Sequence, residues 1–270
     1  MTNSVLKVFS YLPNPRVWKS IIAGRFCGIE VEVVGDKPGE LGTWLWDFEP
    51  RPLTEEERTK DSPYARVGRR GFSGMLFKTD AFLSAHPFGT VPAAFSPDGE
   101  VGIFESNSIL RSVARSAPEG STIYGSSGYE ASRIDSFLDA GLVFAREAQV
   151  YLLGIDGISA ESYQRMEAAY EFYLSGIEAT LSNNPYLVGK NLTIADISFV
   201  CDFAQFLREG HYEEKLNNQG LSLISGKGQE LYPRSFEHML DLNSRSEFSE
   251  VMGTYLNWYR RKLSDQGEEE

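Results

Sequence analysis

The residues best suited to chemistry lie at the two ends of a predicted β-hairpin. Val91 and Pro92 precede a short apolar run, and Glu105 and Ser106 follow a second one after a Ser-Pro-Asp-Gly turn. Apolar runs flanking such a turn are typical of a hairpin. We expect Ser106 to cap a helix that begins at about Asn107. The free N–H groups at that helix start could hold a carboxylate and Glu105 an ammonium group, so the pair suits a small zwitterion.

The elements that must position these residues form an α/β unit. Hydrophobic periodicity predicts a strand at 5–9, a helix at 16–27 and a strand at 30–34, followed by the hairpin and its helix. This is the order of a thioredoxin-like domain, which we place at 1–117. A segment rich in Pro, Gly and Ser follows, and residues 128–270 have the pattern of an all-helical domain.

An insertion at about 42–85 separates the second predicted strand from His86 and is rich in aromatic side chains. Long loops in compact domains are commonly functional or disordered. Closely spaced aromatic residues argue against disorder. Two interpretations stay open: the aromatic side chains pin the insertion to the core, or they line a pocket for an aromatic substrate.

Composition argues against several classes of function. A net charge of −12 disfavours a nucleic-acid surface, because phosphate contacts require clustered Lys and Arg. No apolar run has the length of a membrane span, and the N-terminus lacks the pattern of a signal peptide. The two cysteines, Cys27 and Cys201, lie in apolar helical patterns, so we expect buried thiols and a cytoplasmic protein.

The three histidines do not have the spacing of metal ligands. We expect His211 and His238 on helix surfaces. His86 precedes the hairpin and is expected either at a cap or on the surface, or close to the bound ligand.

These motifs resemble the glutathione transferase superfamily. Val91-Pro92, the hairpin and Glu105-Ser106 are similar to its thioredoxin-like domain, and the segment 186–197 is similar to its helical domain. Within that segment Thr193 and Asp196 form a capping box, which begins a buried helix and carries no chemistry. The runs Pro-Asn-Pro-Arg-Val-Trp and His-Pro-Phe-Gly-Thr-Val-Pro also resemble the transferase-like domain of the elongation factor 1 complex gamma subunit.

The resemblance implies a site for glutathione as co-substrate. It implies a cis Val91–Pro92 bond, with the Val91 backbone paired to the cysteinyl backbone of glutathione. It also implies that Glu105 and Ser106 bind the γ-glutamyl group.

The reaction that the resemblance implies is attack by the glutathione thiolate on an electrophile. Each unit by which the thiol pKa falls below about 8.5 requires about 1.4 kcal/mol of preferential thiolate stabilisation, so a hydrogen-bond donor must face the sulfur. We favour Asn14 as the catalytic residue, because its amide has two N–H donors and no titratable proton. Tyr11 and Ser10 remain alternatives.

The gamma-subunit-like core, Asn14 and the aromatic insertion together resemble bacterial glutathione-dependent β-etherases. That resemblance implies cleavage of β-aryl ether bonds in lignin-derived aromatics, in which a phenolate leaves and a donor near it would help. The candidates for the substrate pocket are Tyr11, Trp46, Tyr64 and Tyr151.

The alternative function is a non-catalytic binding or scaffold subunit of a translation-type complex, as the gamma subunit's own domain is. The expected partners are a small aromatic substrate and a second transferase chain, in a homodimer or in a heterodimer with a paralogue. We expect no nucleic acid, membrane or metal.

Overall fold

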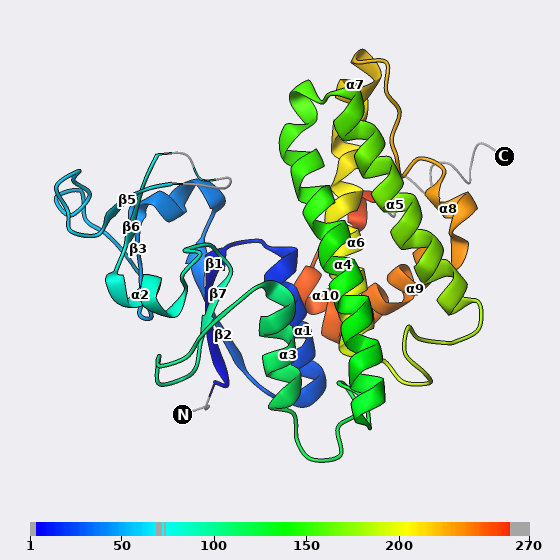
Figure 1. Cartoon of the computed structure of the whole chain (residues 1–270), viewed down its shortest axis with the longest axis horizontal. Coiled ribbons are helices and arrows are strands. Elements are labelled where there is room, and N and C mark those ends of the chain that lie inside the picture. The colour runs from blue at the N-terminus through cyan, green and yellow to red at the C-terminus, as the bar shows by residue number, and fades with distance from the viewer. Residues whose placement is uncertain (1–3, 69–71, 73, 260–270) are drawn as a thin grey trace. The chain divides into compact units, whose positions relative to one another are not determined.

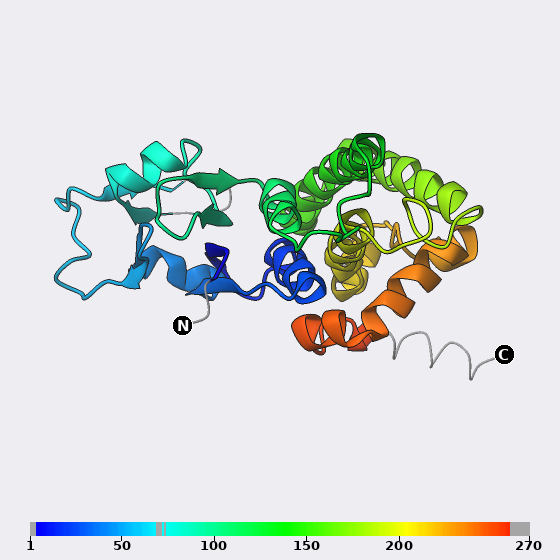
Figure 2. The same cartoon turned by 90° about the horizontal axis from the view of Figure 1, so that it is seen from below.

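The computed structural model describes residues 4–68, 72 and 74–259, and it divides the chain into two compact units, 1–118 and 119–270 (Figure 1). Unit 1 is a mixed α/β domain, and unit 2 is helical (Figure 2). The expected fold class, a thioredoxin-like domain with an insertion followed by a helical transferase domain, is confirmed. Residues 260–270 of the expected helical domain lie outside the described residues.

The main sheet of unit 1 has the strand order β2-β1-β7-β8. Strand β1 is parallel to β2 and antiparallel to β7, and β7 forms the hairpin with β8. Helices α1 and α3 pack against each other. These elements are β1 (Leu6–Tyr11), α1 (Pro15–Cys27), β2 (Val31–Asp36), β7 (Ala93–Phe95), β8 (Gly102–Phe104) and α3 (Ser106–Arg115).

Local sequence fixes both ends of α1. The Asn14 side chain caps the N-terminus by accepting a hydrogen bond from the Arg16 backbone N–H, and Pro15 occupies the first helical position. Gly28 ends the helix in the left-handed region at φ +64°, where a residue without Cβ is favoured. The loop that joins β1 to α1 is therefore held at a defined start of the helix.

The insertion builds a second four-stranded sheet, of order β4-β3-β6-β5. Trp46 is fully buried, with its ring 5.5 Å from that of Phe9 in the main sheet and 5.9 Å from that of Phe82. At this position the aromatic side chain pins the insertion to the core. The elements are η1 (Pro38–Thr43), β3 (Trp44–Trp46), β4 (Arg51–Pro52), β5 (Ala65–Val67), β6 (Met75–Lys78) and α2 (Asp80–Ala85).

In unit 2, helix α6 lies in the core, with every residue except Gln205 buried, and packs against α4 and α9. The expected capping box is confirmed: Thr193 and Asp196 bond each other's backbone at the start of α6. The helices are α4 (Gly128–Gly154), η2 (Ile155–Gly157), α5 (Ala160–Leu181), α6 (Ile194–Phe206), η3 (Leu207–Tyr212), α7 (Glu213–Asn218), α8 (Gly228–Leu231), α9 (Pro233–Ser244) and α10 (Ser246–Met252).

One of the histidine predictions needs correction. His238 does not lie on a helix surface: its Nε2 is 2.9 Å from a carboxylate oxygen of the buried Asp196, because the carboxylate that completes the capping box also faces α9. His86 is fully buried and occupies the C-cap position of α2, which is one of its expected placements. His211 is exposed, and Cys27 and Cys201 are buried free thiols, all as expected.

No helix in the described parts of the chain is both long and apolar enough to cross a membrane.

Candidate functional site

The strand register brings the predicted site residues to one edge of the main sheet. Phe9 pairs with Ala93, and Ala93 pairs with Phe104, so these three residues form one row across β1, β7 and β8. Because β7 runs opposite to its two neighbours, the end of β1, the start of β7 and the end of β8 lie at the same edge. Residues 10–14, 91–92 and 105–106 therefore meet there.

Asn14 and Ser10 form a buried pair at the end of β1. The Asn14 Nδ2 donates to Ser10 Oγ at 3.0 Å, while its Oδ1 accepts from the Arg16 N–H at 3.0 Å. Both side chains are fully buried. The amide is held in one orientation, and the bond to Ser10 uses one of the two hydrogens on its nitrogen.

The loop before β7 ends in a cis peptide bond between Val91 and Pro92. Its turn is closed by the Gly89 N–H, which donates to the carbonyl of His86 at 2.8 Å. Leu12–Pro13 in the β1–α1 loop is also cis. We did not predict this second cis bond from the sequence. Its only sequence signal is the proline that follows Leu12.

Helix α3 begins one residue earlier than expected. Ser106 is its first residue, and Glu105 occupies the N-cap position without a side-chain cap bond, so the prediction that Ser106 caps the helix is wrong. Glu105 has φ +67°, the only positive φ among the described non-glycine residues. Such backbone is costly for a residue with Cβ and concentrates at functional sites. The Glu105 side chain is exposed at the N-terminus of α3.

His86 follows α2, and its ring is surrounded by aromatic side chains. Its ring is stacked on Phe82, with centroids 5.7 Å apart, and is 5.1 Å from the Phe104 ring. Burial lowers the pKa of His86, and the nearby Lys78 ammonium lowers it further. The imidazole is therefore neutral at pH 7.

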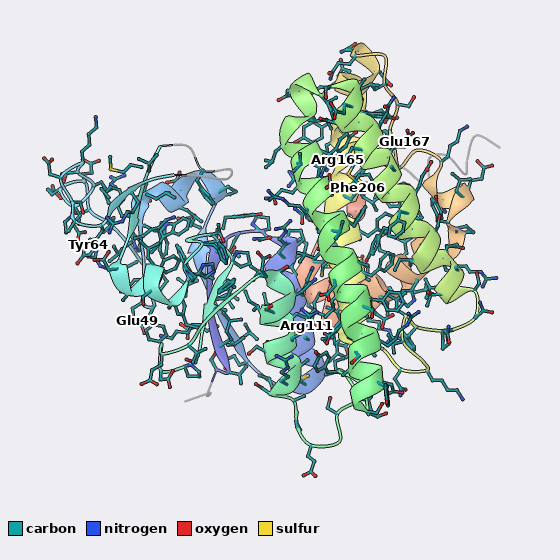
Figure 3. The ribbon with its side chains drawn as sticks, viewed as in Figure 1. Glu49, Tyr64, Arg111, Arg165, Glu167 and Phe206 are labelled. Atoms are coloured by element: carbon teal, nitrogen blue, oxygen red, sulfur yellow. The ribbon has the colours of Figure 1, made fainter. Side chains whose placement is uncertain are left out.

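The four residues expected in a substrate pocket lie in different surroundings. Tyr11 is half-buried and packs against the aromatic cluster around Trp46. Tyr64 lies in the insertion and is 40% exposed (Figure 3). Trp46 and Tyr151 need correction as donors to a leaving group: each is buried, and each already donates, Trp46 Nε1 to the Leu41 carbonyl and Tyr151 Oη to Glu209.

Tyr151 belongs to the core of unit 2. Its ring is 6.3 Å from that of Phe206, which Figure 3 labels within the helical unit. Burial and the Glu209 carboxylate raise the pKa of Tyr151 well above its ordinary value, so the phenol stays protonated. The bond to Glu209 is structural.

Sequence reasoning missed Lys78. It ends β6, is only 8% exposed, and donates from Nζ to the carbonyl of Gly89 at 2.6 Å. The available signal was weak: a single lysine after the apolar run Met75–Phe77. The residues that the structure describes include no group of three or more His, Cys, Asp or Glu side chains that could hold a metal ion.

Residues 134–216 match the family of the glutathione S-transferase C-terminal domain. The chain belongs to the glutathione transferase superfamily. The fold agrees: the glutathione transferase URE2P8 of Phanerochaete chrysosporium, solved with oxidised glutathione, is 16% identical, and each chain is covered to 97% with a TM-score of 0.64.

Two curated relatives illustrate the similarity in sequence. The glutathione S-transferase-like protein LUC7 of Fusarium is 24% identical over 93% of this chain and 86% of its own length. A probable elongation factor 1-gamma of Arabidopsis thaliana is 34% identical over 73% of this chain and 40% of its own length. The chain spans between 31% and 41% of the length of the elongation factor 1-gamma relatives it matches.

Proposed function

We propose that this protein binds glutathione at the sheet edge in unit 1 and uses its thiolate to attack a hydrophobic, aromatic electrophile. The observation that carries the proposal is the register of β1, β7 and β8. That register brings together the Asn14–Ser10 pair, the cis Val91–Pro92 bond and the start of α3.

Two of the three parts of glutathione, the cysteinyl and the γ-glutamyl part, are assigned to groups at this edge in our proposal. The Val91 backbone pairs with the cysteinyl backbone, as a strand edge pairs with an added strand. The N–H groups and hydroxyl at Ser106 hold the γ-glutamyl carboxylate, which the positive end of α3 favours. The Glu105 carboxylate takes the γ-glutamyl ammonium group, and its exposed position supports this role.

Asn14 stabilises the thiolate in this proposal. Its orientation is fixed by the bonds to Ser10 and to the Arg16 N–H, and its second amide hydrogen is the donor to sulfur. Ser10 and Tyr11 lie next to it and remain the alternatives. A fixed neutral donor lowers the thiol pKa without accepting the proton, which passes to solvent.

The best specific reaction is cleavage of a β-aryl ether. The thiolate attacks the carbon that carries the aryloxy group beside a ketone, the C–S bond forms, the C–O bond breaks, and a phenolate leaves. Support for this substrate class comes from the sequence resemblance and from the aromatic insertion. The side chain of Tyr64 is exposed. Tyr64 is therefore the candidate left in the insertion for donating a hydrogen bond to the leaving phenolate.

A chromogenic β-aryl ether ketone, incubated with the protein and glutathione, tests this reaction. We expect release of the phenol from at least one enantiomer. If glutathione binds but no phenol is released from either enantiomer, the proposed ether substrate is wrong and the transferase proposal stands.

The second candidate function is a non-catalytic subunit that contacts other proteins. It is favoured by the similarity to elongation factor 1-gamma proteins. Failure of glutathione to bind in calorimetry would favour this function over catalysis.

We also propose that the protein forms dimers through the face of α4 and α5. A surface hollow of about 810 Å³ lies on this helix pair, and its lining includes opposite charges, Arg133 and Glu171, and the 80% exposed Phe172. A two-fold axis brings the same patch of two copies together, so each arginine can face the partner's acidic side chain. A paralogous chain in place of the second copy is the alternative.

A further inference from the structure

Lys78 is a buried cation that links the insertion to the loop before Val91. Its side chain is 8% exposed at the end of β6, and its Nζ donates to the Gly89 carbonyl at 2.6 Å. The same Nζ lies 4.5 Å from the centre of the Trp46 ring. Burial of an ammonium group is costly unless it is paired, so these contacts mark a built arrangement.

The aromatic partner of Lys78 is itself fixed. Trp46 Nε1 donates to the Leu41 carbonyl at 2.9 Å, and its ring makes edge contacts with Phe9 and Phe82. The ammonium group therefore packs on the face of a ring that belongs to the core of unit 1. A rigid support of this kind limits where Nζ can lie.

The carbonyl that Lys78 holds lies two residues before Val91. The Gly89 N–H closes the turn on His86, and Gly89 has φ +56°. A Cβ on Gly89 would lie 3.2 Å from Lys78 Nζ, so the loop and the ammonium group approach closely. From Ala93 onward the chain is fixed by pairing with Phe9. Lys78 thus holds one end of the short segment 90–92, and the sheet holds the other.

We propose that Lys78 is a positioning residue, which fixes the backbone of Val91 for pairing with the cysteinyl part of glutathione. The insertion then supports the glutathione site through this contact, whether or not it also lines a substrate pocket. This inference rests on the proposed function, since it assigns Lys78 to the same site.

Two thiol ligands distinguish positioning from direct binding. Glutathione carries a glycine carboxylate that an ammonium group could bind, whereas γ-glutamylcysteine lacks glycine and keeps the groups that Val91, Glu105 and Ser106 would hold. Lys78→Met keeps most of the length of the side chain and removes its charge and donors. Lys78→Arg keeps the charge and serves as the conservative variant.

We expect Lys78→Met to raise the Kd of both thiols by a similar factor, about tenfold for one charge-assisted hydrogen bond. The kcat at saturating glutathione should change by less than about twofold, because bound ligand reorders the loop. Lys78→Arg should restore part of the affinity. Loss of affinity for glutathione alone would overturn positioning and make Lys78 a ligand of the glycine carboxylate. Unchanged affinity for both thiols would also overturn it.

Amide hydrogen exchange without ligand separates this inference from the proposed function. We expect the Gly89 amide, which donates to the His86 carbonyl, to exchange faster in Lys78→Met than in the wild type, while the amides of β1 are unchanged. This result would stand even if the wild type did not bind glutathione. Equal exchange in the two proteins would contradict the inference. Lys78→Leu, which also lacks the charge and the donors, provides the same comparison if the methionine variant does not fold.

Discussion

At the scale of single residues, Asn14 combines a structural and a proposed catalytic part in one amide group. Its oxygen caps α1, and its nitrogen donates to Ser10 and, in our proposal, to the thiolate. The two parts use different atoms, so substitutions can separate them.

Asn14→Ser should separate cap from donor. Serine is a good N-cap residue, so the free energy of unfolding should stay within about 0.5 kcal/mol of the wild type, whereas Asn14→Ala should lose about 1 kcal/mol. Both variants lack the amide donor, and both should raise the pKa of bound glutathione, measured by its thiolate absorbance against pH. A normal thiolate pKa in both variants would move the role to Tyr11 or Ser10.

His86 should make the stability of the protein depend on pH. Burial lowers its pKa in the folded protein, while in the unfolded chain it titrates near the ordinary value of about 6.5. The unfolded state therefore binds more protons below about pH 6.5, and stability falls as the pH decreases through the window down to the folded pKa.

Urea unfolding at pH 7.5 and pH 5.5 tests this dependence. We expect the wild type to lose stability at the lower pH and His86→Phe, which keeps an aromatic ring between Phe82 and Phe104, to lose less. A matched His211→Phe variant controls for the other histidine whose pKa burial lowers. The same loss in His86→Phe and the wild type would refute the assignment.

At the scale of elements, the start of α3 combines strained backbone with a proposed ligand contact. Glu105→Gly should relieve the positive φ and stabilise the fold by about 1 kcal/mol, while weakening glutathione binding. Glu105→Gln keeps the backbone cost and removes the charge, so it should weaken binding without the gain in stability. Thermal melts and calorimetry measure the two effects. Unchanged glutathione affinity in both variants would show that Glu105 does not bind the ligand.

Sequence alone predicted the elements whose signals are local. The cap at Thr193, the end of α1 at Cys27 and the hairpin all depend on residues close in the chain. The insertion sheet was not predicted, because its strands are two to four residues long and show no alternation. The Lys78–Gly89 contact depends on how β6 lies against the loop, which no local pattern encodes. The start of α3 was misplaced by one residue because the positive φ of Glu105 has no signature in sequence.

At the scale of the whole molecule, the two units divide the proposed work. Unit 1 carries the groups proposed to bind glutathione, and unit 2 carries the α4–α5 face proposed for a second copy. The acidic net charge of −12 opposes association, so the α4–α5 contact must supply apolar area and local charge pairs.

Phe172→Glu should convert a dimer into a monomer, because it places a carboxylate beside Glu171 in the hollow and removes the exposed ring. Light scattering measures the mass of each variant. Leu231→Glu, at a 59% exposed position on α8 and outside the α4–α5 face, should leave the dimer intact. A wild type that is monomeric at all concentrations, or a Phe172→Glu variant that remains dimeric, would contradict the assignment of this face.

Calorimetric titration of glutathione into the wild-type chain and Glu105→Gln tests the central claim most directly. The account predicts one glutathione site per chain, with affinity reduced at least about tenfold in the variant for loss of a paired charge. Absence of binding to the wild type, or equal binding by both proteins, would contradict a glutathione site built from the end of β1, the Val91–Pro92 loop and the start of α3.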